Sequence, residues 1–249
     1  MRCGDLLGAP MVAGLTSSGL CRACRMAPPA FERAVAYGPY QNRMRAAIHA
    51  LKYDHLHAAT RGLGGMLAQA ISRLAGEAPG DMLVIPVPLH RTKYSERGFN
   101  QARSLAVYAL KALRKAHPEW RLTLASTTLM RLRATKSQAG LTSRQRRLNV
   151  RGAFMVSDAA AVNQKHVLVI DDIFTTGATA RAAAQALVRA GAASVWVATL
   201  ARAHRLHESR VVTSSRFYDA EEDFELASNA QAADSQGASN SSSHDLPSF

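Results

Sequence analysis

The sequence has few cysteines and no long apolar run. Only 3 of its 249 residues are cysteine, a small and odd number that argues against a disulfide-built scaffold. No stretch approaches the roughly 18 uninterrupted apolar residues of a membrane-spanning helix, because Gly8, Pro10 and Gly14 interrupt the mildly apolar N-terminal segment. We therefore expect a cytoplasmic protein in a reducing compartment, with no membrane span.

Aromatic residues are also scarce, and acidic residues are scarce over most of the chain. Aromatics make up 6% of the sequence, which leaves few rings for stacking bases, mainly Tyr94, Phe99 and Phe154. The formal charge is +13, and the seven acids after Tyr218, where no Lys or Arg occurs, leave +20 on residues 1–218. Such a field attracts nucleic acid or phosphate-rich ligands, but a solvated basic surface without a partner has the same composition.

Composition divides the chain into three parts. Residues 1–30 hold every cysteine and show little periodicity, which predicts a small knuckle that depends on a metal such as zinc. Residues 31–218 carry enough periodic apolar sequence for one α/β domain. Residues 219–249 are rich in Ser, Asn, Gln and acids, which predicts a disordered tail.

Apolar spacing predicts the elements of the central part. After a short strand-like piece, apolar residues three or four apart indicate helices within 44–51 and 63–74, and a third helix is expected at about 100–116. Strands are indicated at 82–87 and near 121–124, with a basic loop after the first of them.

The clearest unit lies in residues 166–200. It reads as a strand at 166–170, a turn at 171–177, an alanine-rich helix to about residue 190 that Gly191 ends, and a strand at 195–200. Two buried strands around one helix predict a βαβ crossover in a parallel sheet.

Two adjacent acids open the turn of this unit. Asp171 and Asp172 follow the strand and should therefore lie at the carboxyl edge of the sheet, where ligands bind in open α/β folds. Carboxylates accept hydrogen bonds from ribose hydroxyls or hold Mg²⁺, but they repel a phosphate placed directly against them. A phosphate needs other partners.

Hydroxyl donors and a helix start follow the acids. Thr175, Thr176 and Thr179 supply hydroxyls, and Gly177 lacks the Cβ that would hold a phosphate away from the backbone. The helix that begins near Ala178 directs its free N–H groups and positive dipole end to the same place. Helix capping explains one such polar residue, but it does not explain two acids, three threonines and a glycine in nine residues. The pattern therefore predicts a site for a phosphorylated sugar.

The segment VLVIDDIFTTGAT (167–179) resembles the 5-phosphoribosyl 1-pyrophosphate (PRPP) motif of type I phosphoribosyltransferases. Other segments resemble one branch of that class, the ComF family, which is associated with bacterial DNA uptake. They are IHALKY (48–53), IPVPLH (85–90), ERGFNQA (96–102), TKSQAGLTSRQRRLNVRGAF (135–154) and TLAR (199–202). The resemblance covers roughly residues 1–202. It implies a type I phosphoribosyltransferase-like parallel sheet flanked by helices, over about 31–218, after a small cysteine-containing knuckle.

The resemblance also implies site residues. Asp171 and Asp172 should meet the ribose hydroxyls, with or without Mg²⁺, and residues 86–91 should meet the pyrophosphate, which basic side chains suit. The residues expected to bind substrate in the turns are Thr175, Thr176, Gly177, Ala178, Thr179, Pro88, Arg91, Lys93, Arg97, Asn100 and Gln101. A solvated basic turn is the alternative for Arg91, Lys93 and Arg97.

Residues 131–151 contain seven Lys or Arg and no acid, which predicts an exposed, mobile loop. If the protein is catalytic, pyrophosphate would be displaced at the anomeric carbon, and this loop would close over the site and exclude water. The catalytic candidates are then Asp171, Asp172, Arg133 and Lys136. The additional substrate-binding candidates are Gln138, Arg144, Arg147 and Asn149.

The three cysteines are Cys3, Cys21 and Cys24. Members of the ComF family commonly begin with two CxxC pairs that bind zinc, and this chain has the second pair, with Cys3 resembling half of the first. Four thiolates would complete a tetrahedral zinc site. Either a fourth cysteine lies upstream of Met1 in the gene, or the protein has lost its zinc.

Two classes of function remain open from the sequence. One is an enzyme that transfers phosphoribosyl to an acceptor, including a nucleobase salvage phosphoribosyltransferase with no DNA role. The other is an accessory protein of DNA uptake that uses PRPP as a ligand or signal and binds single-stranded DNA. We favour PRPP binding in the service of DNA uptake. No pattern locates an acceptor, and the acidic tail is expected to compete with nucleic acid for the basic face.

Overall fold

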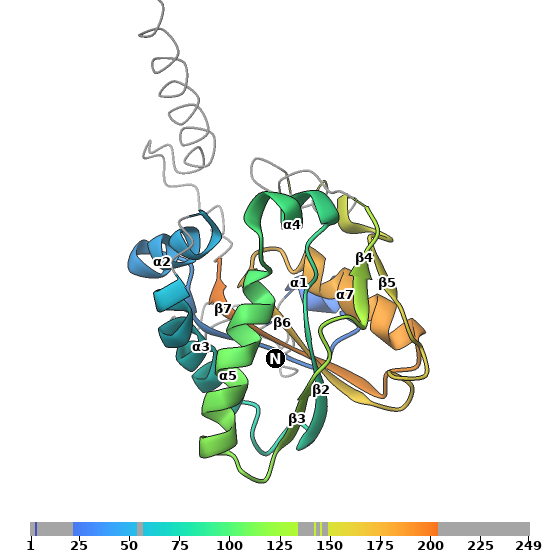
Figure 1. Cartoon of the computed structure of the whole chain (residues 1–249). Coiled ribbons are helices and arrows are strands. Elements are labelled where there is room, and N and C mark those ends of the chain that lie inside the picture. Colours follow the sequence, from blue (N-terminus) through green and yellow to red (C-terminus); the bar gives the residue numbers. More distant parts are fainter. Residues whose placement is uncertain are drawn as a thin grey trace, which may run out of the picture.

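The computed structural model describes residues 3, 22–53, 57–133, 142, 145 and 149–203. A five-stranded sheet runs through it in the order β1-β7-β6-β2-β3 (Figure 1). Its strands are β1 (Ala34–Pro39), β2 (Asp81–Pro86), β3 (Arg121–Leu124), β6 (His166–Phe174) and β7 (Ser194–Arg202). Every neighbouring pair is parallel, so the carboxyl ends of all five strands meet at one edge of the sheet, the carboxyl edge.

Strands β6 and β7 lie at the centre because they are apolar on both faces. Their register runs from His166 opposite Ser194 to Phe174 opposite Arg202. The strand expected at 166–170 is therefore confirmed, but it is four residues longer. Asp171 and Asp172 belong to the strand and not to the turn, because β7 continues far enough to pair with the whole of β6.

Helices cover both faces of the sheet (Figure 1). Helices α2 (Asn42–Tyr53), α3 (His57–Ser72) and α5 (Gln101–Ala116) share one apolar cluster with Leu168 and Ile170 of β6. Helix α7 (Ala178–Arg189) shares another cluster with Val167 and Val169. The two clusters take alternate residues of β6, as the two faces of a strand require.

The three helices expected on the first face are confirmed, and their ends follow local signals. Asn100 caps α5 by accepting a hydrogen bond from the N–H of Arg103 at 3.0 Å, and Gly191, with a φ of 94°, lies just beyond α7. The basic loop expected after β2 contains a helix instead, α4 (Arg91–Arg97). The side chain of His90 caps its start, and Gly98 ends it with a φ of 71°.

Two small elements complete the described part of the chain. Strands β4 (Leu129–Arg131) and β5 (Phe154–Val156) form an antiparallel ribbon beside α7 (Figure 1). Helix α1 (Arg22–Met26) contains Cys24, which is buried together with Cys3 in the cluster under α7. Among the described residues, no helix is long and apolar enough to cross a membrane. The tail expected at 219–249 lies outside the described residues.

Candidate functional site

The turn between β6 and α7 is tight and depends on one glycine. Gly177 has a φ of 74°, and a Cβ added to it would lie 2.5 Å from the ring of Phe174. Glycine is therefore required for two independent reasons. The hydroxyl of Thr176 accepts a weak hydrogen bond from the N–H of Ala178 at 3.4 Å. At Gly177 no side chain caps α7, and the first N–H groups of a helix have no acceptor within the helix, so a phosphate can bind there.

The two adjacent aspartates have different surroundings, since consecutive strand residues point to opposite faces. Asp172 is buried, and its Oδ2 lies 3.2 Å from Nζ of Lys52, at the end of α2. Asp171 is half-buried, and its Oδ1 accepts the N–H of Asp172 at 2.9 Å. The nearby cation on its side is Arg131, on β4. The acid pair thus lies between a cation of α2 and a cation of β4.

The protonation of Asp171 is strongly perturbed. Burial, and then the negative charge of Asp172, raise the pKa of Asp171 to about 8, against the opposing charges of Lys52 and Arg131. Without a ligand, a large fraction of Asp171 is therefore protonated at neutral pH. A bound cation or a hydroxyl donor would favour the ionised form.

Asp172 is ionised by its partner. Burial works to raise the pKa of Asp172, but the charge of Lys52, its hydrogen bond, the N–H of Ile173 and the charge of Arg97 together lower this pKa below its ordinary value. Burial also works to lower the pKa of Lys52, but the charge of Asp172, the charge of Tyr40 and the hydrogen bond to Asp172 together raise it above its ordinary value. Arg97 on α4 adds to the field, since its charge lowers the pKa of both Asp172 and Lys52. The segment that follows the carboxyl end of β2, here called the exit of β2, thus affects the charges at the corresponding exit of β6.

The residues expected to bind pyrophosphate lie along the exit of β2. Arg91 and Lys93 are exposed on α4, and Lys93 forms an ion pair with Glu96 at 2.7 Å. Pro88 lies between β2 and α4. Asn100 has a structural role, because its Nδ2 donates to the carbonyl of Val87 at 3.0 Å and so ties the end of β2 to α5.

Gln101, at the start of α5, is 5% exposed. Its Oε1 has no hydrogen-bond partner among the described residues. A buried amide oxygen without a partner carries a desolvation penalty that a ligand donor could remove. The unpartnered oxygen is consistent with the prediction that Gln101 binds substrate. The hydrogen bonds of Asn100, in contrast, are explained by its position at the start of α5.

Only part of the basic segment 131–151 is described. Arg133 is exposed and donates from Nη2 to the carbonyl of Arg151 at 2.7 Å, which ties the two ends of the segment together. Asn149 is half-buried. The candidates Lys136, Gln138, Arg144 and Arg147 lie outside the described residues, and all these assignments stay predictions.

The cysteines lie beside arginines on the α7 side of the sheet. Nη2 of Arg181 lies 3.8 Å from Sγ of Cys24, and Nη2 of Arg202 lies 3.5 Å from Sγ of Cys3. Both thiols are buried. Cys21 lies outside the described residues, so the expected set of metal ligands stays a prediction.

Sequence reasoning assigned no role to Lys52 or Arg131. Lys52 falls four residues after Ile48, which is fully buried on α2, so helical spacing places a lysine on the buried face. A lysine there requires a partner, and this is the signal that could have identified it. No comparable sequence pattern predicts a role for Arg131, because its distance from Asp171 depends on where the ribbon β4–β5 lies in the fold.

A parallel sheet whose central strand carries two acids near its carboxyl end, followed by a glycine turn onto a helix, defines a domain of the phosphoribosyltransferase type. The family model described as "Phosphoribosyl transferase domain" matches residues 108–229, which include β6, the turn and α7.

Curated relatives narrow this class. The DNA utilization protein YhgH of Escherichia coli O157:H7 is 33% identical over 185 residues, which are 73% of this chain and 77% of that protein. Competence protein F of Haemophilus influenzae is 27% identical over 188 residues, 74% of this chain and 78% of that protein. With matches that span most of both chains, this protein belongs to the ComF family.

A solved structure also matches in part. It is the glutamine PRPP amidotransferase from B. subtilis complexed with ADP and GMP, 26% identical, with a TM-score of 0.34. The match covers 57% of this chain and 26% of that chain.

Proposed function

We propose that this protein binds PRPP at the carboxyl edge of its sheet and that this binding serves DNA uptake or utilisation. The observation that carries the proposal is the arrangement of β6, its turn and α7. Two carboxylates lie near the carboxyl end of the strand, and a 12-residue helix starts after a turn that contains Gly177. A ligand that presents vicinal hydroxyls beside a phosphate matches this order of groups.

The 5′-phosphate is assigned to the turn. Backbone N–H groups at the start of α7, with the hydroxyls of Thr175, Thr176 and Thr179, provide hydrogen-bond donors. All three threonines are half-buried, so they are held near the backbone without being closed off from a ligand. Gly177 allows the phosphate oxygens to approach the chain closely.

The ribose hydroxyls are assigned to the acid pair. Asp171 is the better placed of the two, because Asp172 is already engaged by Lys52. The ion pair keeps Asp172 charged, and a charged Asp172 raises the pKa of Asp171, which leaves Asp171 responsive to a bound donor or cation. Mg²⁺ suits this edge through the Asp171 carboxylate together with oxygens of the ligand itself, since Mg²⁺ commonly binds one or two carboxylates plus substrate phosphates.

The pyrophosphate is assigned to cations at the exit of β2. Arg97 lies near enough to Asp172 and Lys52 to affect the pKa of both. A pyrophosphate between the carboxyl ends of β2 and β6 would contact Arg97. Lys52 could exchange its ion pair with Asp172 for one with the pyrophosphate. Guanidinium groups bind such oxyanions with two parallel hydrogen bonds.

Phosphoribosyl transfer at such a site would break the bond from the anomeric carbon to the pyrophosphate oxygen and form one to a nucleophile. Positive charge would develop on the ribose, next to the carboxylates, and negative charge on the leaving group, next to the cations. The described residues therefore suit the charges of such a step. Release of pyrophosphate from PRPP in the presence of candidate acceptors is the measurement that detects turnover.

The role in DNA uptake or utilisation rests on family and charge. The relatives that span most of this chain are called DNA utilization protein and Competence protein F. Residues 1–218 carry a formal charge of +20, as derived above from the composition, which attracts polyanions. Binding of single-stranded DNA and of proteins of the uptake machinery forms part of the proposal.

The deciding experiment is calorimetric titration of the full chain with PRPP and Mg²⁺. The variant Asp171→Asn with Asp172→Asn should lose affinity by about 100-fold or more, because each charged hydrogen bond contributes roughly 1.5–3 kcal/mol. The matched control is Asp158→Asn, which changes an exposed acid that caps a turn before the amino end of β6, whereas Asp171 and Asp172 lie near the carboxyl end of that strand. Equal affinity of the double variant and the parent would remove the site.

Zinc binding by the N-terminal region is the remaining part of the proposal. Two of its thiols, Cys3 and Cys24, are buried, and each lies beside a guanidinium that would stabilise a thiolate. Metal analysis of the purified chain should find zinc at about one ion per chain, and Cys24→Ser should reduce it. Zinc content at background in the parent would end this proposal.

A further inference from the structure

A groove lies at the end of the sheet opposite the aspartates. It has a volume of about 170 Å³ and lies between the C-terminal half of α5 and the edge strand β3. Its floor includes Leu110 and Leu113, its wall includes His117 and Trp120, and two cations, Arg114 and Arg121, also line it. Because α5 has 16 residues, its two ends are about 24 Å apart. The groove is therefore separate from the proposed PRPP site.

The aromatic wall of the groove is held in a fixed arrangement. The rings of His117 and Trp120 stack with centroids 4.5 Å apart and an interplanar angle of 17°. His117 is held further by Ser72 Oγ at 2.9 Å from Nε2 and Glu119 Oε1 at 3.1 Å from Nδ1. The backbone N–H of Trp120 also donates to the backbone carbonyl of His117 at 3.0 Å. A stacked ring pair held in this way lowers the conformational cost of binding a flat ligand.

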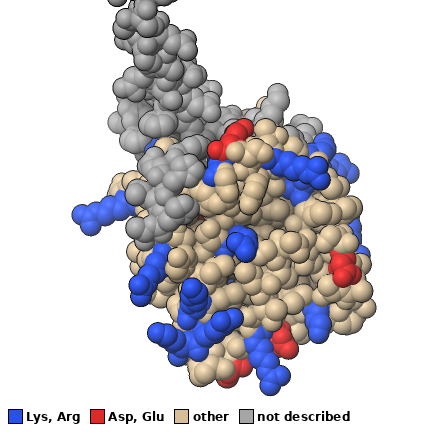
Figure 2. Space-filling model, viewed as in Figure 1, with Lys and Arg blue, Asp and Glu red and all other residues tan. Residues whose placement is uncertain are grey.

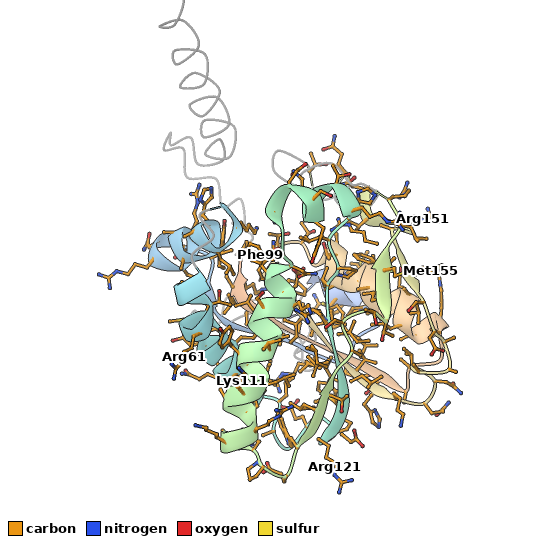
Figure 3. All side chains as sticks on the ribbon, viewed as in Figure 1. Arg61, Phe99, Lys111, Arg121, Arg151 and Met155 are labelled. Carbon is orange, nitrogen blue, oxygen red and sulfur yellow. The ribbon has the colours of Figure 1, made fainter. Side chains whose placement is uncertain are left out.

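Basic side chains surround much of the groove, beside two exposed acids, Asp81, which lies opposite Arg121 in the register of β2 with β3, and Glu119. Helix α5 contains no acid and exposes Arg103, Lys111, Arg114 and Lys115. Figure 3 shows Lys111 on the outer side of α5 and Arg121 projecting at the far end of β3. Figure 2 shows Lys and Arg side chains spread over this face, with Asp or Glu side chains between them at the lower end of the molecule, where Figure 1 places the end of α5 and the start of β3. Such a field raises the local concentration of anions.

We propose that this groove binds a nucleotide unit, with the base against the His117–Trp120 stack and its phosphates on Arg114 and Arg121. The unit can be a free nucleotide or part of a single strand, since both present the same base and phosphate. Bases stack on aromatic side chains largely without regard to sequence, and arginines beside them bind the backbone. The inference does not depend on PRPP binding, because it uses other residues at another edge.

The chemistry of the lining favours a nucleotide over other ligands. Leu110 and Leu113 are nearly fully buried, so the apolar floor is small, and an apolar ligand would leave the two guanidinium groups unused. An acidic peptide would use Arg114 and Arg121 but not the aromatic wall. A nucleotide uses both, which is the reason for committing to it.

The test uses the full chain carrying Trp196→Phe, which leaves Trp120 as its only tryptophan. Titration with a single-stranded oligothymidylate, without PRPP, should quench Trp120 fluorescence. Arg114→Glu with Arg121→Glu should lower the affinity about tenfold or more. Both arginines are exposed, so these changes should leave the fold intact. The matched control is Lys165→Glu with Arg189→Glu, which makes the same charge change at exposed positions outside the groove and should lower the affinity less than threefold.

Further arms separate the outcomes. Thymidine monophosphate that quenches Trp120 identifies the nucleotide unit as sufficient, whereas quenching by the oligonucleotide alone identifies the strand as the ligand. Quenching by polyglutamate equal to that by the oligonucleotide would overturn the proposal. An equal loss of affinity in the Lys165 and Arg189 control would overturn it as well. The Asp171→Asn, Asp172→Asn variant should bind the oligonucleotide like the parent, so failure here and failure of PRPP binding are distinguishable.

Discussion

The exits of β6 and β2 both lie at the carboxyl edge, but they differ in how firmly the fold holds them. The turn after β6 has Phe174 and Gly177 buried, and Asp172 is ion-paired below it. Helix α4, after β2, has no buried residue. One exit is therefore part of the core, and the other is a surface helix that carries charge. Changes at the β6 exit should affect stability and binding together, whereas changes in α4 should affect binding alone.

Lys52→Met tests the β6 exit most severely. It leaves Asp172 buried without its cation, and breaking a buried ion pair from one side costs on the order of 3 kcal/mol. We expect denaturant unfolding to show a loss of this size and calorimetry to show weaker PRPP binding. Adding Asp172→Asn should restore much of the stability, because the unpaired charge is gone. If Lys52→Met alone unfolds like the parent, the ion pair is not important for the fold.

Gly177→Ala should have a smaller but still combined effect. A residue with a Cβ at a φ of 74° is strained, and the new methyl would collide with the ring of Phe174, so we expect a loss of about 2 kcal/mol. Thermal unfolding and PRPP titration measure the two consequences. Gly98→Ala, also at positive φ but with no atom within 4 Å of the added Cβ, is the control for strain without collision. Equal losses in both variants would show that Phe174 does not matter.

Arg97→Ala tests the contrast from the β2 side. We expect PRPP affinity to fall about tenfold, because one charged contact to the pyrophosphate is lost, while the free energy of unfolding changes by less than about 0.5 kcal/mol. Lys165→Ala, at an exposed position before the amino end of β6, is the control and should change affinity less than twofold. A marked loss of stability in Arg97→Ala would contradict the proposed difference between the two exits.

A pH dependence that arises at Asp171 is the last test of the β6 exit. Its pKa is about 8 in the folded protein against an ordinary value of 3.8, so between these pH values the folded state holds a proton that the unfolded chain has released. The free energy of unfolding should therefore fall as pH rises from about 4 to 8. Asp171→Asn should reduce this slope in thermal unfolding measured from pH 5 to pH 8. Parallel curves for parent and variant would show that Asp171 titrates normally.

Much of the site could be predicted because its pattern is local. The strand, the two acids, the threonines and Gly177 occupy consecutive positions, and spacing alone places them at a strand end and a helix start. The end of β6 was wrong by four residues, because strand length depends on how far the neighbouring β7 extends. A basic loop was expected where helix α4 lies. His90 and Gly98 are the local signals for the start and the end of this helix, but the density of basic residues between them favoured a loop.

The sequence by itself determined the parallel sheet, the helices on its faces and the order of acids, hydroxyls and helix start around Gly177. These depend on periodicity and on residues adjacent in the chain. Only the tertiary structure decided that Lys52 meets Asp172, that Arg131 lies near Asp171, and that His117 and Trp120 line a groove with Arg121. Those contacts join segments far apart in the chain, and the strand order that brings them together is set by the packing of the whole domain.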